Sequence, residues 1–233
     1  MIIEIWSDVM KLVFRIKTKL FRMISEPFFR KKRELSFRSR LKNDNFTIIS
    51  SNCIGGIMYS SLGKKFLSPT INLSMDSESF ISFLENMEHY LNSKLEFLEI
   101  ADGEEYDFGQ IKGYPIGKID DIKIHFVHYK SFEDAEIKWN ERKKRINFEN
   151  MFVVMSDKDN CTDEIIDRYS KINYPKVFYT HRPVLKYDFM CYVPGFEKEN
   201  EVGVITRYSD FSGNRYFEKY FDFVNWINTG VNK

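Results

Sequence analysis

Two spacings of hydrophobic residues divide the chain from residue 45 onward. Short runs rich in β-branched and aromatic residues, such as residues 46–50 and 151–156, alternate with longer stretches in which apolar residues recur every three or four positions. The short runs are typical of buried strands and the longer stretches of amphipathic helices. Their alternation predicts an α/β fold, in which helices pack on both faces of a mixed, mostly parallel sheet to give three layers.

The ends of these segments predict the individual elements. We expect strands at residues 46–50, 95–100, 151–156 and 176–181, a short helix or turn at 55–66, two strands within 113–129, and helices that begin near Asp76 or Ser77, Ser131 and Thr162. The first of these helices runs through Tyr90, and a final helix covers residues 215–228. The two strands within 113–129 meet at Asp120-Asp121, a hairpin that makes the sheet mixed.

The first 43 residues differ from the rest, and we interpret them as a basic amphipathic helical head that precedes a single α/β domain at 44–233. Apolar residues at steps of three or four share one helical face in this head (Ile2, Trp6, Val9, Val13, Ile16, Leu20 and Ile24). Charges interrupt every apolar run before the roughly 20 residues that a spanning helix needs. Glu4 and Asp8 stand where a signal peptide would be basic.

Charge is distributed unevenly between head and body. Residues 1–42 hold 12 Lys or Arg against 4 Asp or Glu, whereas the remainder holds 23 against 30. A basic amphipathic helix suits the anionic inner face of a membrane, so one expectation is peripheral membrane contact through residues 1–33. The alternative is that the same stripe packs on the body or on a second copy. The basic residues carry no recognition motif for nucleic acid, and we expect none as a partner.

The three cysteines, Cys53, Cys161 and Cys191, have neither the framework spacing of disulfide-rich domains nor the spacing of a zinc site. They indicate a reducing compartment and therefore a cytoplasmic protein. Hydrophobic residues make up 43% of the chain, which is ample for a core.

Ligands of open α/β sheets collect outside the carboxyl ends of strands, and three expected strand ends carry polar residues. The first follows residues 46–50 and reads Ser50-Ser-Asn-Cys-Ile-Gly-Gly56. Ser51, Asn52, Gly55 and Gly56 are candidates for substrate binding, because glycines admit a ligand close to the backbone and successive amides bind anions. The alternative is a tight turn that requires a positive φ at one of the glycines.

The second strand end follows residues 151–156. Asp157 and Asp159 flank one residue there, and such a pair of carboxylates can hold Mn²⁺ or Mg²⁺ against a diphosphate. The alternative is that these residues form turns and cap the helix that begins near Thr162.

The third strand end carries His181, a candidate general base, and Arg182, which is suited to neutralise a phosphate. His125 and His128 lie three apart in an expected strand and so face opposite sides, which leaves at most one of them in a pocket. We favour His128 as a second catalytic candidate. Cys53 is a third, as an acyl-transfer nucleophile, against the alternative of a small buried side chain.

These segments also resemble a known family. The strings ISSNCIGGIMYSSLGKKFLSPTINL, YPIGKIDDIKIHFVHYKSFEDAEIKWNERKKRIN, FVVMSDKDNCTDE, VFYTHRP and VPGFEKENEVG are similar to a bacterial family of unknown function whose members are often labelled exopolysaccharide-biosynthesis proteins, some of them acetyltransferases. The resemblance covers residues 44–228. It implies a compact α/β domain and a place in exopolysaccharide or capsule synthesis, and it supplies no catalytic residue.

Three functions stay open. A glycosyltransferase would use a nucleotide sugar and a metal at Asp157 and Asp159. An acyltransferase would use acetyl-CoA, with His128 or His181 as base on a hydroxyl of a sugar or lipid-linked sugar. A regulator or scaffold of the synthesis complex would have no catalytic cleft. We expect a sugar-directed transferase that is cytoplasmic and peripheral at the inner membrane face.

Overall fold

The computed structural model describes residues 27–98, 113–209 and 212–232. A helix over residues 27–40 comes first. The elements that follow are β1 Thr47–Ser50, α2 Ile54–Leu62, α3 Ser77–Glu85, α4 Met87–Asn92, β2 Glu96–Phe97, β3 Ile116–Ile119, β4 Ile122–His125, α5 Phe132–Lys143, the 3₁₀ helix η1 Phe148–Asn150, β5 Met151–Ser156, α6 Asp163–Ser170, β6 Lys176–Thr180, β7 Met190–Tyr192, α7 Tyr216–Tyr220 and α8 Phe223–Thr229.

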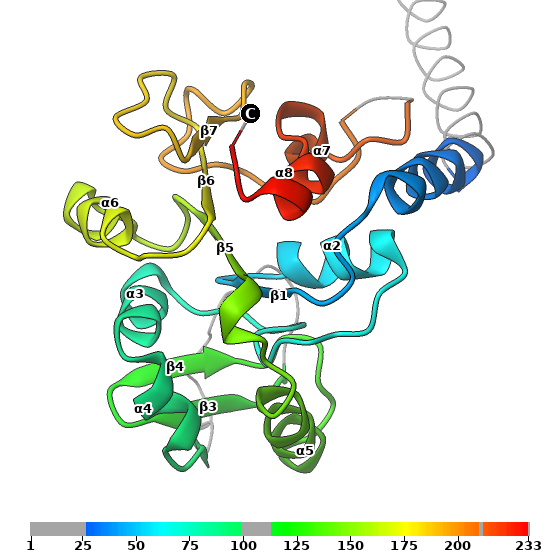
Figure 1. Ribbon diagram of the computed structural model, residues 1–233. Coiled ribbons are helices and arrows are strands. Elements are labelled where there is room, and N and C mark those ends of the chain that lie inside the picture. The colour runs from blue at the N-terminus through cyan, green and yellow to red at the C-terminus, as the bar shows by residue number, and fades with distance from the viewer. Residues whose placement is uncertain (1–26, 99–112, 210–211, 233) are drawn as a thin grey trace, which may run out of the picture.

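A four-stranded parallel sheet organises the molecule, with the strand order β1-β5-β6-β7. Helices lie on both sides of it, with α2, α7 and α8 above and α3, α4 and α5 below in Figure 1. The prediction of an α/β fold with a mostly parallel sheet and packed helices is therefore confirmed.

Both faces of the sheet are buried, because successive strand residues point to opposite sides. On β5, Val153 and Met155 join the core cluster that also contains residues of α3, α5 and α6. Phe152 and Val154 join a second cluster with residues of α2, α7 and α8. The continuous apolar sequence of β5 is thus the pattern of a central parallel strand covered on both faces.

A second, antiparallel sheet has the order β2-β3-β4, and β3 and β4 lie below the parallel sheet with α3, α4 and α5 in Figure 1. The expected hairpin forms, and Asp120 takes the positive φ of 52° at its turn. We expected this hairpin to extend the parallel sheet. It pairs instead with β2 in a separate sheet. Ile119, Ile122 and Ile124 then pack in the same core cluster as α3.

Helix starts match the sequence well, and helix lengths match less well. Asp76, Ser131 and Thr162 each accept a hydrogen bond from a first-turn amide of α3, α5 and α6. The expected helix through Tyr90 breaks at Asn86, which has φ −130° and ψ 42° and separates α3 from α4. The expected final helix also divides, into α7 and α8, because Phe221 has an extended backbone.

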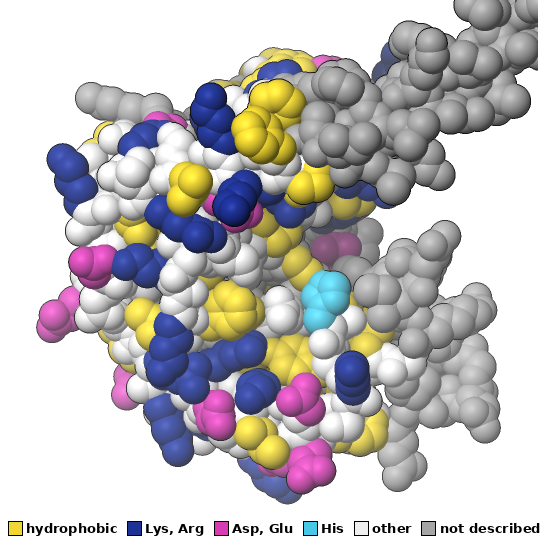
Figure 2. Space-filling model, turned by 90° about the vertical axis from the view of Figure 1, so that its right-hand side faces the viewer, with side chains coloured by type: hydrophobic (Ala, Val, Ile, Leu, Met, Phe, Trp, Pro, Cys, Tyr) yellow, Lys and Arg dark blue, Asp and Glu magenta, His cyan; other side chains and the backbone are white. Residues whose placement is uncertain are grey.

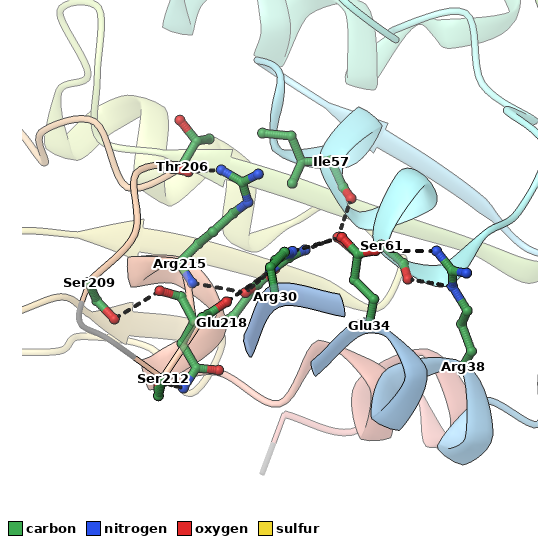
Figure 3. A network of polar contacts seen from close by, with 12 residues as sticks. Arg30, Glu34, Arg38, Ile57, Ser61, Thr206, Ser209, Ser212, Arg215 and Glu218 are labelled. Carbon is green, nitrogen blue, oxygen red and sulfur yellow. Dashed lines mark hydrogen bonds and ion pairs between the residues drawn. The ribbon is translucent and has the colours of Figure 1, made fainter. Parts of the chain in front are cut away.

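Helix 27–40 packs on the body through a buried ion pair. Arg30 Nη1 lies 2.6 Å from Glu218 Oε2 of α7, and the two side chains are 8% and 0% exposed. Arg30 also donates to Ser61 Oγ of α2, and Figure 3 shows how this network joins the three helices. Phe37 belongs to the same core cluster as α2 and α8. This part of the predicted head therefore takes the packing alternative, while the stripe at residues 1–24 lies outside the described residues.

None of the helices in the described parts of the chain is both long and apolar enough to cross a membrane.

Candidate functional site

The carboxyl ends of β1, β5 and β6 meet at one edge of the parallel sheet, because neighbouring strands run in the same direction. Asn52, two residues beyond β1, donates from Nδ2 to Ser156 Oγ at the end of β5, at 3.2 Å. Asp157 follows Ser156, and His181 follows the last residue of β6. The structure thus brings three of the predicted site residues to one edge, from segments more than 20 residues apart.

Asp157 and His181 form a hydrogen-bonded pair at this edge. His181 Nδ1 lies 2.6 Å from Asp157 Oδ2, and the side chains are 13% and 1% exposed. A carboxylate only accepts hydrogen bonds, so Nδ1 carries the proton in this pair. Nε2 then carries the lone pair, and no described residue forms a hydrogen bond with it. This is the relation between carboxylate and imidazole that turns a histidine into an oriented general base.

The pair is held rigidly because three other donors also reach the Asp157 carboxylate. Oδ2 accepts from Thr180 Oγ1 at 2.6 Å and from the His181 amide at 2.9 Å. Oδ1 accepts from the Val202 amide at 2.7 Å. A buried carboxylate needs such donors to replace water. The same donors fix the carboxylate plane and with it the direction of the imidazole.

Residues 201–202 form a strap across the strand ends. Val202 binds Asp157, as described above, and Glu201 Oε2 accepts from the Asp159 amide at 3.0 Å. Glu201 Oε1 also lies 3.3 Å from Lys158 Nζ. The strap therefore holds both aspartates of the Asp157-Lys158-Asp159 segment, one by its side chain and the other by its backbone.

Asp157 and Asp159 have different surroundings, and their joint binding of a metal stays a prediction. Asp159 has a positive φ of 58°, and burial, assisted by the charge of Glu201, raises the pKa of its carboxyl to about 6. Both oxygens of Asp157 already accept from the protein. Within residues 27–98, 113–209 and 212–232, no group of three or more His, Cys, Asp or Glu side chains is arranged to hold a metal ion. Asp157 does not cap α6 either, since Thr162 does so.

The Ser50–Gly56 loop is a helix start whose amides are largely occupied. Ser50 Oγ accepts from the Gly55 amide at 3.3 Å, and Asn52 Oδ1 accepts from the Ile54 amide at 3.1 Å. Ser51 is held through its backbone, which bonds Val154 and Met75. These bonds leave Asn52 as the residue of this loop that reaches the other strand ends, through Nδ2.

Gly55 and Gly56 lie inside α2 without a positive φ, so the alternative of a positive-φ turn is wrong. Their lack of a side chain serves packing instead. A Cβ on Gly55 would lie 2.9 Å from Ser50 Cβ, and one on Gly56 would lie 3.2 Å from Asn72 Oδ1. Gly55 lets α2 approach β1 closely, and Gly56 lets it approach Ile71 and Asn72.

Cys53 packs in a different cluster from the Asp157–His181 pair. It contacts a small apolar cluster of Tyr114, Ile116 and Val127. Burial raises the pKa of its thiol to about 11, so the thiol stays protonated at neutral pH. A protonated thiol is a weak nucleophile, which favours the alternative of a small packed side chain.

His128 and His125 lie in different surroundings. His128 is exposed in a turn beyond β4. Among the described residues, it forms no hydrogen bond with Asp157 or His181. His125 is buried, with Nδ1 3.3 Å from Tyr114 Oη, and burial lowers its pKa. The predicted alternation of the two along one strand is wrong, because β4 ends at His125 and His128 lies beyond it.

Arg182 lines a groove of about 350 Å³, together with Val184, Lys186 and residues of α6, and His181 is not among its lining residues. Its guanidinium pairs with Asp163, and its amide donates to Thr180 Oγ1 at 3.1 Å. Arg182 thus lies beside the pair but already has a partner for its charge. Thr180, Glu201 and Val202 were not predicted, because a strand threonine and a loop amide carry no signal in the sequence.

Comparison with known proteins adds a family match. Residues 24–228 match the model of a domain of unknown function (DUF1919). The chain is also similar to an uncharacterized protein of Haemophilus influenzae, with 34% identity over 194 residues that cover 83% of this chain and 89% of that protein. The family match begins at residue 24 rather than 44, so it includes helix 27–40, which packs on the body.

Proposed function

The chain belongs to the DUF1919 family, and we propose that it is an acyltransferase that uses His181 to activate a sugar hydroxyl. The observation that carries this proposal is the bond of 2.6 Å between His181 Nδ1 and Asp157 Oδ2. It orients an imidazole whose Nε2 forms no hydrogen bond with a described residue, at the carboxyl edge of the parallel sheet, the usual place for a ligand.

The reaction needs one proton carrier. Nε2 takes the proton of the acceptor hydroxyl while the hydroxyl oxygen attacks the carbonyl carbon of an acyl thioester such as acetyl-CoA. The tetrahedral intermediate then expels the thiolate, which recovers the proton from Nε2 and leaves as a thiol. Asp157 stabilises the imidazolium during this exchange.

Two parts of the proposal have different support. The choice of acyl over glycosyl transfer follows from the use of Asp157 as a partner of His181 rather than as a free metal ligand. The sugar acceptor, the role in exopolysaccharide or capsule synthesis and the location at the cytoplasmic membrane face follow from the family resemblance alone.

Thermal stability in the presence of donors tests the proposal first. A ligand that binds only the folded state raises the melting temperature by mass action. We expect acetyl-CoA to stabilise the purified chain with or without Mn²⁺, and nucleotide sugars to have no effect. Stabilisation by a nucleotide sugar that requires Mn²⁺ would contradict the proposal and favour glycosyl transfer. No stabilisation by any donor would favour a regulator or scaffold.

Variants of the pair then test the mechanism. Asp157→Asn keeps the size of the side chain but favours the wrong imidazole tautomer, so acyl transfer should fall roughly 10²- to 10⁴-fold in kcat. His181→Ala should cause a similar loss, and acetyl-CoA should still shift the melting temperature. His128→Ala is the matched control, because His128 is exposed and outside the pair. Loss of activity in His128→Ala with full activity in His181→Ala would refute the assignment.

A further inference from the structure

Helix 27–40 has an outer face unlike that of a helix exposed only to water. Phe28, Lys31, Lys32 and Leu35 follow the spacing i, i+3, i+4, i+7 and so form one stripe. Phe28 is 67% exposed and Leu35 is 56% exposed, and both lysines are exposed. Single exposed apolar residues are ordinary, but two large ones on one stripe of a helix indicate a contact surface.

The helix cannot bury this stripe against its own body. The opposite side already holds Phe37 in the core and Arg30 in the buried ion pair with Glu218. Turning Phe28 and Leu35 inward would break this pair and leave a charge buried without a partner, a costly arrangement. The ion pair therefore fixes the outward direction of the stripe.

The stripe is also positively charged. Neither Lys31 nor Lys32 forms an ion pair with any described residue, and Glu34, the nearest acid along the helix, pairs with Arg30 and Arg38. Figure 2 looks onto the side of the molecule on which this helix lies, and Lys, Arg and apolar side chains stand next to one another in its upper part. Apolar side chains at both ends of a stripe with two unpaired cations between them match an anionic lipid surface, in which rings enter the acyl boundary and ammonium groups meet phosphates.

We propose that Phe28, Lys31, Lys32 and Leu35 form the face by which this protein lies on an anionic membrane. The inference gives a contact surface to the membrane location proposed above, and it does not depend on the chemistry of His181. A second copy of the chain fits less well, because a twofold contact across this stripe would set lysines against lysines with no acid between them. Nucleic acid would use the lysines but not the two apolar side chains.

Flotation with lipid vesicles tests the proposal on the full chain. Vesicles of phosphatidylcholine with phosphatidylglycerol should bind the protein, and vesicles of phosphatidylcholine alone should bind it at least tenfold more weakly. Phe28→Ser/Leu35→Ser and Lys31→Glu/Lys32→Glu should each weaken binding to the anionic vesicles about tenfold or more. Added salt should weaken the wild-type interaction as well.

Matched controls change the same chemistry elsewhere. Phe132→Ser/Ile137→Ser removes two apolar side chains of α5 that are 44% and 46% exposed. Lys65→Glu/Lys144→Glu makes the same change in net charge at two other exposed lysines. Both control variants should bind like the wild type, and circular dichroism should be unchanged in all four.

Three results would overturn the inference: wild-type binding by both stripe variants, equal binding to neutral and anionic vesicles, or a dimer that Phe28→Ser/Leu35→Ser dissociates. The first would place lipid contact elsewhere in the chain, and the third would identify a second copy as the partner. His181→Ala should bind vesicles normally, and Phe28→Ser/Leu35→Ser should retain the thermal shift with acetyl-CoA. These two variants separate a failure of this inference from a failure of the proposed chemistry.

Discussion

Asp157 accepts hydrogen bonds from Thr180, His181 and Val202, and these bonds decide what this residue is able to do. Sequence reasoning selected Asp157 because of its spacing to Asp159, and it selected His181 separately because of its place at a strand end. It did not predict that the two would bind each other. Spacing along the chain describes neighbours on one segment, whereas this pair depends on the register between β5 and β6.

Asp159 gives a residue-scale prediction about pH. Its carboxyl pKa is raised from 3.8 to about 6 by burial and by Glu201, so the folded state holds this proton more tightly than the unfolded state does. Stability should therefore fall as the pH rises from about 4 to about 6, since the buried group must then ionise. Asp159→Asn keeps a side chain that tolerates positive φ. It should raise the free energy of unfolding by about 1–2 kcal/mol at pH 7.

Urea unfolding of the wild type and Asp159→Asn at several pH values measures this effect. The two curves of stability against pH should converge below about pH 4, where Asp159 is protonated in both folded and unfolded states. A constant difference at every pH would mean that the variant acts through something other than ionisation.

At the scale of elements, the sequence predicted where helices start better than where they end. It did not predict how closely α2 packs on β1. Asp76, Ser131 and Thr162 cap their helices as expected, because a cap is a local interaction. The breaks at Asn86 and Phe221 have no comparable local signal. Gly55 was noticed for its backbone freedom, but its role is to bring α2 against β1, a contact that no short sequence pattern encodes.

Gly55→Ala tests this packing. The added Cβ would meet Ser50 Cβ at 2.9 Å and Ile48 Cγ2 at 3.2 Å, both on the strand. Overpacking of this kind typically costs about 1–3 kcal/mol, so the substitution should destabilise despite the better helix propensity of alanine. Ser60→Ala, on the exposed side of the same helix, is the control and should be neutral or slightly stabilising in urea unfolding. Equal effects of the two substitutions would show that α2 does not pack this closely.

At the scale of the whole molecule, the sequence predicted that helices cover both faces of the sheet. It did not predict that helix 27–40 packs on the α/β body. Continuous apolar strands predicted two covered faces, and both core clusters bear this out. The hairpin at residues 116–125 was assigned to the wrong sheet, since alternation shows that two strands pair but not which third strand joins them. Arg30 looked like part of a basic surface, because its partner Glu218 is far along the chain.

The Arg30–Glu218 pair should be the most sensitive charged contact between helix 27–40 and the body. Glu218→Gln removes the fully buried counter-charge of the Arg30 guanidinium and leaves it only Glu34 of its own helix. The substitution should cost about 2 kcal/mol or more in the free energy of unfolding. Arg30→Met/Glu218→Leu removes both charges and should recover much of that loss. Lys94→Gln, which removes one partner of the exposed Lys94–Glu96 pair, should change stability by less than about 0.5 kcal/mol. If Arg30→Met/Glu218→Leu is as unstable as Glu218→Gln, the loss of the counter-charge is not the cause of the destabilisation.

This ion pair also has a consequence for the order in which a newly made chain acquires its structure. Its two residues are 188 positions apart, so helix 27–40 leaves the ribosome long before α7 exists to receive it. Until residue 218 has been synthesised, Arg30 has only Glu34 of its own helix as a counter-ion, and the core that takes Phe37 is incomplete. The first described helix is therefore among the last to reach its final place, and a nascent chain stopped before residue 218 should stay open to proteases at residues 27–40.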